Sequence, residues 1–104
     1  MQDRQQFFED TEQYRYDKVR ENLVLTILEK TLVSAQIYHE VLLQLGKKYN
    51  CDLHDCYKHP SYLSTILKNQ HDYSYKSITK SINQQLEIFS DAKPITAFLQ
   101  AFNL

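Results

Sequence analysis

Residues 5–45 contain neither glycine nor proline, and their apolar residues recur every three or four positions. One row consists of Tyr16, Val19, Leu23 and Ile27, and a neighbouring row of Val24, Leu28, Leu32, Ala35, Tyr38, Val41 and Leu45. Steps of three and four place side chains on one side of an α-helix. The pattern therefore predicts helix through this region, with one wide apolar stripe.

The predicted length of this helix is incompatible with a compact domain. One continuous helix over 11–48, ending at Gly46 and the two lysines after it, would be about 57 Å long, whereas a compact domain of this chain length is about 33 Å across. Either the helix breaks, near Asn22 or around 31–34, or it projects. A projecting helix exposes its apolar stripe, which is costly unless another chain covers it.

The sequence of the second half of the chain predicts shorter helices. A loop or short helical turn is expected over 49–59, a helix over 60–69 with Pro60 in its first turn, an amphipathic helix over 75–89, and a last helix after Pro94. No segment alternates in the manner of a strand. We therefore predict an all-α fold. It is a small helical bundle with one long N-terminal helix, continuous or broken, and three or four shorter helices, in a single helical domain over 1–104.

Composition excludes several function classes. A single glycine cannot build a phosphate-cradling loop, so P-loop and dinucleotide-binding folds are excluded. The net charge of −1 gives no overall attraction to nucleic acid or to anionic lipid. Uninterrupted apolar runs reach only three residues, which argues against a membrane span. The polar N-terminal segment has no signal-peptide core, so we expect a cytoplasmic protein with reduced thiols.

The leading hypothesis is a non-enzymatic protein-interaction or regulatory module without a cofactor. It rests on the wide stripe and on the absence of catalytic and nucleotide-binding signatures. Its partner is another protein, in the first place a second copy of the chain, which makes a homodimer along the long helix. The residues predicted at that interface are Leu23, Ile27, Leu28, Tyr38 and Leu42.

An alternative is a small DNA-binding regulator. Residues 60–89 have the layout helix, short turn, helix, which is compatible with a helix-turn-helix. Tyr75, Lys76, Lys80 and Gln84 would read the duplex from the second helix. No arginine follows Arg20, so the commonest contact to guanine is missing. A solvated helix face is the preferred interpretation, and nucleic acid is not the favoured partner.

A third hypothesis is a metal-dependent sensor. Cys51, His54, Cys56 and His59 follow the pattern C-x2-H-x-C-x2-H, and thiolate and imidazole are the ligands that zinc prefers. The two pairs are only five residues apart, whereas structural zinc sites usually separate them by a dozen or more. The alternative to the zinc hypothesis is therefore that the cysteines are buried thiols without a ligand and that the histidines beside them are exposed.

Overall fold

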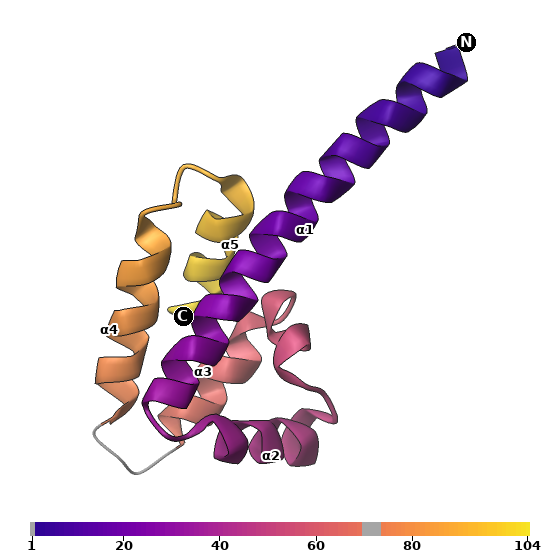
Figure 1. The fold of residues 1–104 in the computed structure, drawn as a ribbon. Helices are drawn as coiled ribbons and strands as arrows, with labels where there is room; N and C mark the ends of the chain where they lie inside the picture. Colours follow the sequence, from indigo (N-terminus) through magenta and orange to yellow (C-terminus); the bar gives the residue numbers. More distant parts are fainter. Residues whose placement is uncertain (1, 70–73) are drawn as a thin grey trace.

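The structure, a computed structural model, describes residues 2–69 and 74–104, and the side chains of 18–69 and 75–104. All regular elements in these ranges are helical, which confirms the predicted all-α fold (Figure 1). In chain order they are α1 (Gln2–Ser34), α2 (Tyr38–Tyr49), the 3-10 helix η1 (Leu53–Tyr57), α3 (Pro60–Lys68), α4 (Ser74–Glu87) and α5 (Lys93–Phe102).

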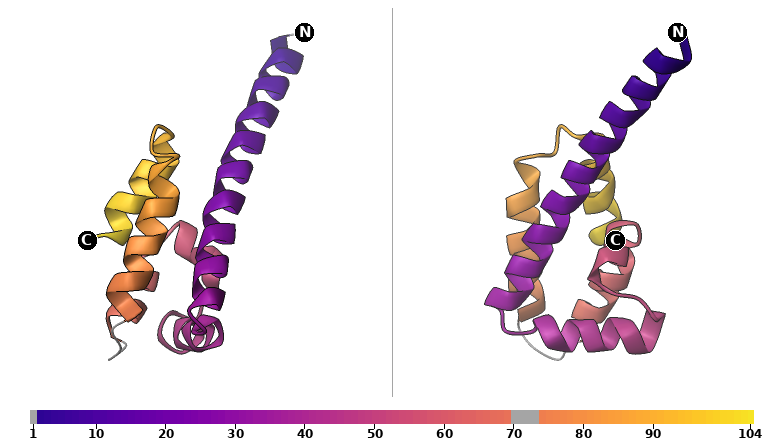
Figure 2. Two further views of the ribbon diagram at one scale, coloured as in Figure 1. Left: turned by 60° about the vertical axis from the view of Figure 1, so that its left-hand side comes forward. Right: turned by 45° about the vertical axis from the view of Figure 1, so that its right-hand side comes forward.

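The helices form a small bundle around the C-terminal half of α1. That half packs against α4 on one side and against η1 and α2 on the other, while α5 lies between α3, α4 and α1 (Figures 1 and 2). α1 and α4 run in opposite directions, and α2 crosses the lower end of the bundle. The N-terminal part of α1 extends beyond the other helices, and the molecule measures 58 × 29 × 23 Å.

Every helix contributes apolar side chains to one core. The buried apolar residues are Val24, Leu28, Leu32, Val41, Leu45, Leu53, Cys56, Leu63, Ile66, Leu67, Ile78, Ile82, Leu86, Ile95, Phe98 and Phe102. Their spacing of three and four along α1, α4 and α5 is the helical period that the sequence shows. The core therefore takes only part of the predicted stripe of α1, and the positions at its edges are half-exposed.

The chain turns sharply after α1, so the continuous helix over 11–48 is excluded. Gln36 adopts a left-handed conformation with φ of 63°. The Ile37 N–H donates to the Leu32 carbonyl at 3.1 Å, and the Gln36 N–H donates to the Val33 carbonyl at 3.0 Å. These two bonds make a Schellman motif, which satisfies carbonyls at a helix end. The break follows directly on the predicted 31–34 alternative, whereas α1 passes Asn22 without interruption.

Gly46 does not terminate α2, contrary to the sequence-based expectation. It lies in the last turn of the helix, which continues to Tyr49. Asn50 ends the helix in a left-handed conformation with φ of 53°, and its N–H donates to the Gly46 carbonyl at 3.1 Å. Asparagine is one of the few residues besides glycine that adopts this conformation readily. Gly46 therefore has an ordinary helical conformation, which does not require glycine.

Gly46→Ala is expected to stabilise the protein by about 0.5–1 kcal/mol, because glycine loses more backbone entropy in a helix than alanine does. A Cβ placed at this exposed position meets no atom within 4 Å. The melting temperature, followed by circular dichroism, should rise by several degrees, at roughly 4–8 °C per kcal/mol. An unchanged or lower melting temperature would contradict the assignment of residue 46 to an open helical position.

The elements of the second half match their predicted positions closely. Pro60 and Pro94 lie in the first turns of α3 and α5. η1 supplies the short helical turn predicted within 49–59, and a reciprocal pair of hydrogen bonds between Asp52 and Asp55 caps it. α4 ends at Glu87, so Phe89 lies beyond the helix and is partly exposed rather than part of the predicted helical face. The short turn predicted between the helices over 60–69 and 75–89 falls largely outside the described residues.

Candidate functional site

The cysteine and histidine side chains around η1 do not assemble into a metal centre. Cys56 is buried in the core, whereas the His54 Nε2 lies 3.1 Å from the Glu21 Oε1 on α1. The His59 ring stacks on the Tyr62 ring, with 4.7 Å between the ring centroids. Across 18–69 and 75–104, no group of three cysteine, histidine or acidic side chains is placed to hold a metal ion. The zinc hypothesis for Cys51, His54, Cys56 and His59 is therefore not supported by the geometry.

Burial accounts for the chemistry of the two thiols. Desolvation in the core, with the charges of Cys51, Asp55 and Asp52 nearby, raises the pKa of Cys56 to about 12. The Cys56 Sγ is 4.0 Å from the Asp52 carbonyl, which accepts its weak hydrogen bond. Cys51 is half-buried, and desolvation together with Asp55 and Asp52 raises its pKa as well. Raised pKa values keep both groups as thiols, the opposite of what a nucleophile requires.

The predicted DNA-reading face lies on α4. Lys76, Lys80 and Gln84 are exposed, whereas Tyr75 is half-buried and packs against the core. α4 packs against α1 and α5, while α3 packs against α2, α5 and η1. The two helices of the predicted helix-turn-helix therefore make their main contacts with other helices, and the DNA hypothesis stays a prediction.

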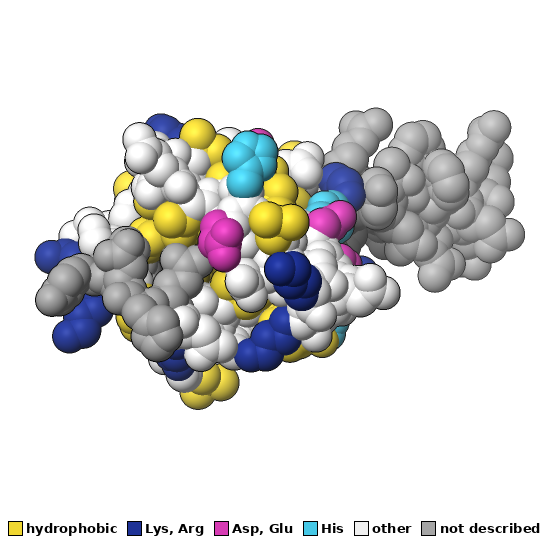
Figure 3. All heavy atoms as spheres, turned by 90° about the horizontal axis from the view of Figure 1, so that it is seen from below, with side chains coloured by type: hydrophobic (Ala, Val, Ile, Leu, Met, Phe, Trp, Pro, Cys, Tyr) yellow, Lys and Arg dark blue, Asp and Glu magenta, His cyan; other side chains and the backbone are white. Residues whose placement is uncertain are grey.

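Another face of the molecule carries charges of both signs. Figure 3 views the bundle from below, where α2 lies, and shows basic, acidic and histidine side chains interspersed with hydrophobic ones. This face offers no single-sign field of the kind that would attract a polyanion.

The five predicted interface residues do not form one surface. Leu28 is fully buried in the core and has no exposed area to offer a second chain. Leu23 and Ile27 precede Thr31 by eight and four residues, on the side of α1 that faces α4. Tyr38 and Leu42 lie on α2, where they line a pocket with residues of η1 and of another side of α1. The predicted interface is thus divided between two separate places.

The pocket at Tyr38 and Leu42 has a volume of about 300 Å³. Its other lining residues are Leu25, Glu29, Asp52, Leu53 and His54. It brings Tyr38 and Leu42, predicted at a dimer interface, next to His54, predicted as a zinc ligand. The lining consists of three leucines and a tyrosine, with two carboxylates and one imidazole.

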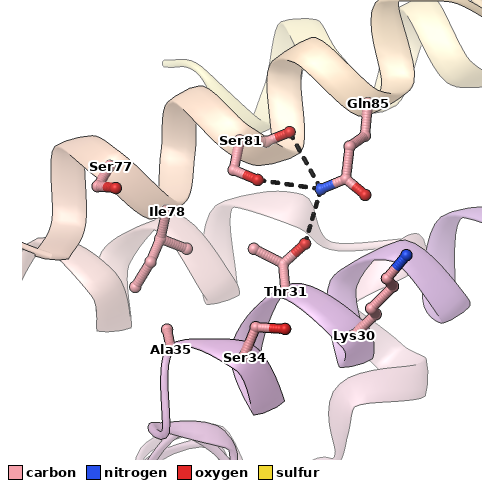
Figure 4. A pocket seen from close by; sticks show the side chains of 8 residues that line it. All are labelled: Lys30, Thr31, Ser34, Ala35, Ser77, Ile78, Ser81 and Gln85. Atoms are coloured by element: carbon pink, nitrogen blue, oxygen red, sulfur yellow. Dashed lines mark hydrogen bonds between the residues drawn. The ribbon is translucent and has the colours of Figure 1, made fainter.

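A larger pocket of about 430 Å³ lies between α1 and α4 (Figure 4). Its lining residues are Lys30, Thr31, Ser34, Ala35, Ser77, Ile78, Ser81 and Gln85. The Gln85 Nε2 donates across the gap to the Thr31 Oγ1 at 2.9 Å and within α4 to the Ser81 carbonyl at 3.2 Å and Oγ at 3.1 Å. Sequence reasoning missed this site because its polar residues look like solvated helix positions. The available signal is the spacing of four between residues 77, 81 and 85.

Comparisons of the chain with protein-family models, with curated proteins and with solved structures give no match. No described helix combines the length and the apolar character that crossing a bilayer requires.

Proposed function

We propose that this protein is a non-enzymatic interaction module that forms a homodimer through one apolar surface at the α1–α4 junction. The surface consists of Val19, Leu23 and Ile27 on α1, with Ile88 and Phe89 directly after α4. The observation that carries the proposal is exposure: Ile88 is 77% exposed and Val19 is 64% exposed.

Two residue rows support this surface. Val19, Leu23, Ile27 and Thr31 follow one another in steps of four along α1, and Ile88 stands three residues beyond Gln85 on α4. The hydrogen bond between Thr31 and Gln85 brings the two rows face to face. Because α1 and α4 run in opposite directions, the apolar ends of both rows lie toward the same end of the bundle (Figure 1).

The α1 row turns gradually away from the core. Each step of four residues rotates the side chain by about 40°, so exposure rises from Thr31, which is buried, through the half-buried Ile27 and Leu23 to Val19. The row therefore leads from the core of one chain to an exposed apolar ridge. Exposed large apolar side chains that gather on one surface are typical of interaction sites.

A second copy of the chain is the occupant that these features favour. A two-fold dimer uses the same patch twice, so a ridge that carries residues of α1 and of the segment directly after α4 can pack against itself. The net charge of −1 gives two copies little electrostatic repulsion. The N-terminal part of α1 extends beyond the other helices, so a second copy can approach α1 along this part (Figure 2).

Ile88→Glu is expected to weaken the dimer by roughly 100-fold or more, because the symmetric interface would bury two carboxylates in place of two apolar side chains. Sedimentation equilibrium should give about twice the chain mass of 12.4 kDa for the unchanged protein and the monomer mass for the variant. Ile27→Glu should act in the same direction, but Ile27 also packs against the core. The exposed Ile88 separates association from folding more cleanly.

Leu43→Glu is the matched control, because Leu43 is 57% exposed on α2, away from the α1–α4 junction. Its dimer should have the affinity of the unchanged protein. The proposal would be contradicted if the unchanged protein were monomeric at a concentration on the order of 100 μM, at which even weak dimers form. It would also be contradicted if a folded Ile88→Glu variant associated as strongly as the unchanged protein.

A further inference from the structure

We propose that the pocket between α1 and α4 binds a small oxyanion with several acceptor oxygens, the chemistry of a phosphate group. The pocket lies on the same two helices as the apolar surface but at its polar end, around Thr31 and Gln85. The inference is independent of the homodimer, since none of the five residues of the apolar surface lines the pocket.

The Gln85 amide fixes the hydrogen-bond directions inside the pocket. A backbone carbonyl can only accept, so the Gln85 atom that lies 3.2 Å from the Ser81 carbonyl must be the nitrogen. The same nitrogen lies 2.9 Å from the Thr31 Oγ1 and 3.1 Å from the Ser81 Oγ. The amide has two hydrogens for these three acceptors, so one hydrogen is shared between two of them. Both hydroxyl oxygens accept from Gln85, and their own hydrogens remain to be donated.

Those hydrogens have no acceptor among the described residues. Serine and threonine in helices often donate to the carbonyl four residues earlier, but no such bond is formed by Thr31, Ser34 or Ser81 within 18–69 and 75–104. Thr31 is only 7% exposed, so its hydroxyl can donate to little besides a group inside the pocket. A ligand oxygen inside the pocket would accept this hydrogen.

The charge of the pocket selects an anion. Lys30 lines one side, and in the described part of the chain no carboxylate is within ion-pair distance of its ammonium group. No acidic residue is among the lining residues. Hydroxyl donors together with one unpaired ammonium match an anion with several oxygens, because hydrogen bonds to a charged acceptor are stronger than neutral ones. The volume of about 430 Å³ also accommodates a small ester of phosphate.

The test is a titration followed by two-dimensional ¹H–¹⁵N NMR at constant ionic strength, with inorganic phosphate, glycerol 3-phosphate and glycerol as the three probes. Phosphate or its ester should shift the amide signals of residues 30–35 and 77–85, and glycerol should leave them in place. Saturation by inorganic phosphate alone identifies the free ion as the ligand, whereas a tighter response to the ester identifies a phosphorylated small molecule.

Lys30→Gln should raise the dissociation constant about tenfold, the typical effect of losing one charge-assisted contact. Lys80→Gln is the matched control, because it removes the same charge from the exposed outer face of α4. Ser34→Ala, at an exposed position that should not affect folding, should weaken binding severalfold. Equal affinities in the Lys30 and Lys80 variants, shifts distributed over all lysines, or no shifts with either anion would overturn the proposal.

Discussion

Leu28→Ala is expected to lower the free energy of unfolding by about 2–5 kcal/mol, the usual cost of truncating a buried leucine. Leu28 is fully buried and lies in the middle of the core part of α1, with Val24 and Leu32 one turn away on either side. Its loss removes apolar contacts and leaves a cavity that rigid helices fill only in part. Urea denaturation followed by circular dichroism measures the change.

Leu104→Ala is the control for this measurement. Leu104 is 85% exposed at the end of the chain, so its truncation should change the free energy of unfolding by no more than about 0.5 kcal/mol. A loss below about 1 kcal/mol for Leu28→Ala would contradict its placement in the core. That outcome would instead suit the sequence-based prediction, in which Leu28 faces a second chain.

The hydrophobic periodicity could locate the apolar stripe of α1, but it could not separate the residues of the core from those at the edge of the stripe. Val24, Leu28 and Leu32 lie at the centre of the stripe, and the other helices of the same chain cover them. Leu23 and Ile27 lie at its edge and keep exposed area. Hydrophobic spacing reports that a face is buried, but it contains no information on whether the covering helix belongs to the same chain. The prediction of the interface therefore mixed core and edge residues.

The sequence predicted the end of α1 only approximately because the residue at its left-handed position is unusual. Helix ends of this type usually carry glycine or asparagine in the left-handed position, whereas Gln36 occupies it here. The motif is supported by a tertiary feature, since Leu32 is in the core and Ile37 packs against it. By contrast, Pro60 and Pro94 restrict the backbone directly, and the helices that they begin could be predicted from the sequence.

The candidate pocket was out of reach of sequence reasoning because its walls are distant in the chain. The residues Thr31 and Gln85, which join across it, are 54 positions apart. The pattern around Cys51 shows the opposite error. Close spacing suggested a shared ligand, but η1 sends Cys56 into the core while His54 pairs with Glu21 on another helix. Nearness in sequence and nearness in space differ in both cases.

Cys56 is expected to react with iodoacetamide roughly 1,000-fold more slowly than an unperturbed cysteine, because the reactive thiolate is depleted by that factor when the pKa rises from 9.0 to about 12. Burial of the side chain slows the reaction further. Timed alkylation at pH 8 with peptide mass spectrometry measures the labelling of each thiol. Cys51, half-exposed in the same molecule, should be labelled first. In urea both thiols should react alike, which provides the control.

The same raised pKa predicts a loss of stability in alkaline solution. The folded protein holds the Cys56 proton up to a pH of about 12, whereas an unfolded thiol releases it near 9.0. The resulting stabilisation is complete below pH 9 and is lost as the pH rises from there toward 12. Between pH 7 and pH 10 the unchanged protein should therefore lose about 1.4 kcal/mol more than Cys56→Ala. Comparing the two proteins at both pH values cancels the cost of the substitution itself and the titration of tyrosines and lysines. Equal losses would mean that Cys56 ionises as readily in the folded chain as in the unfolded one, and rapid alkylation at pH 8 should then accompany them.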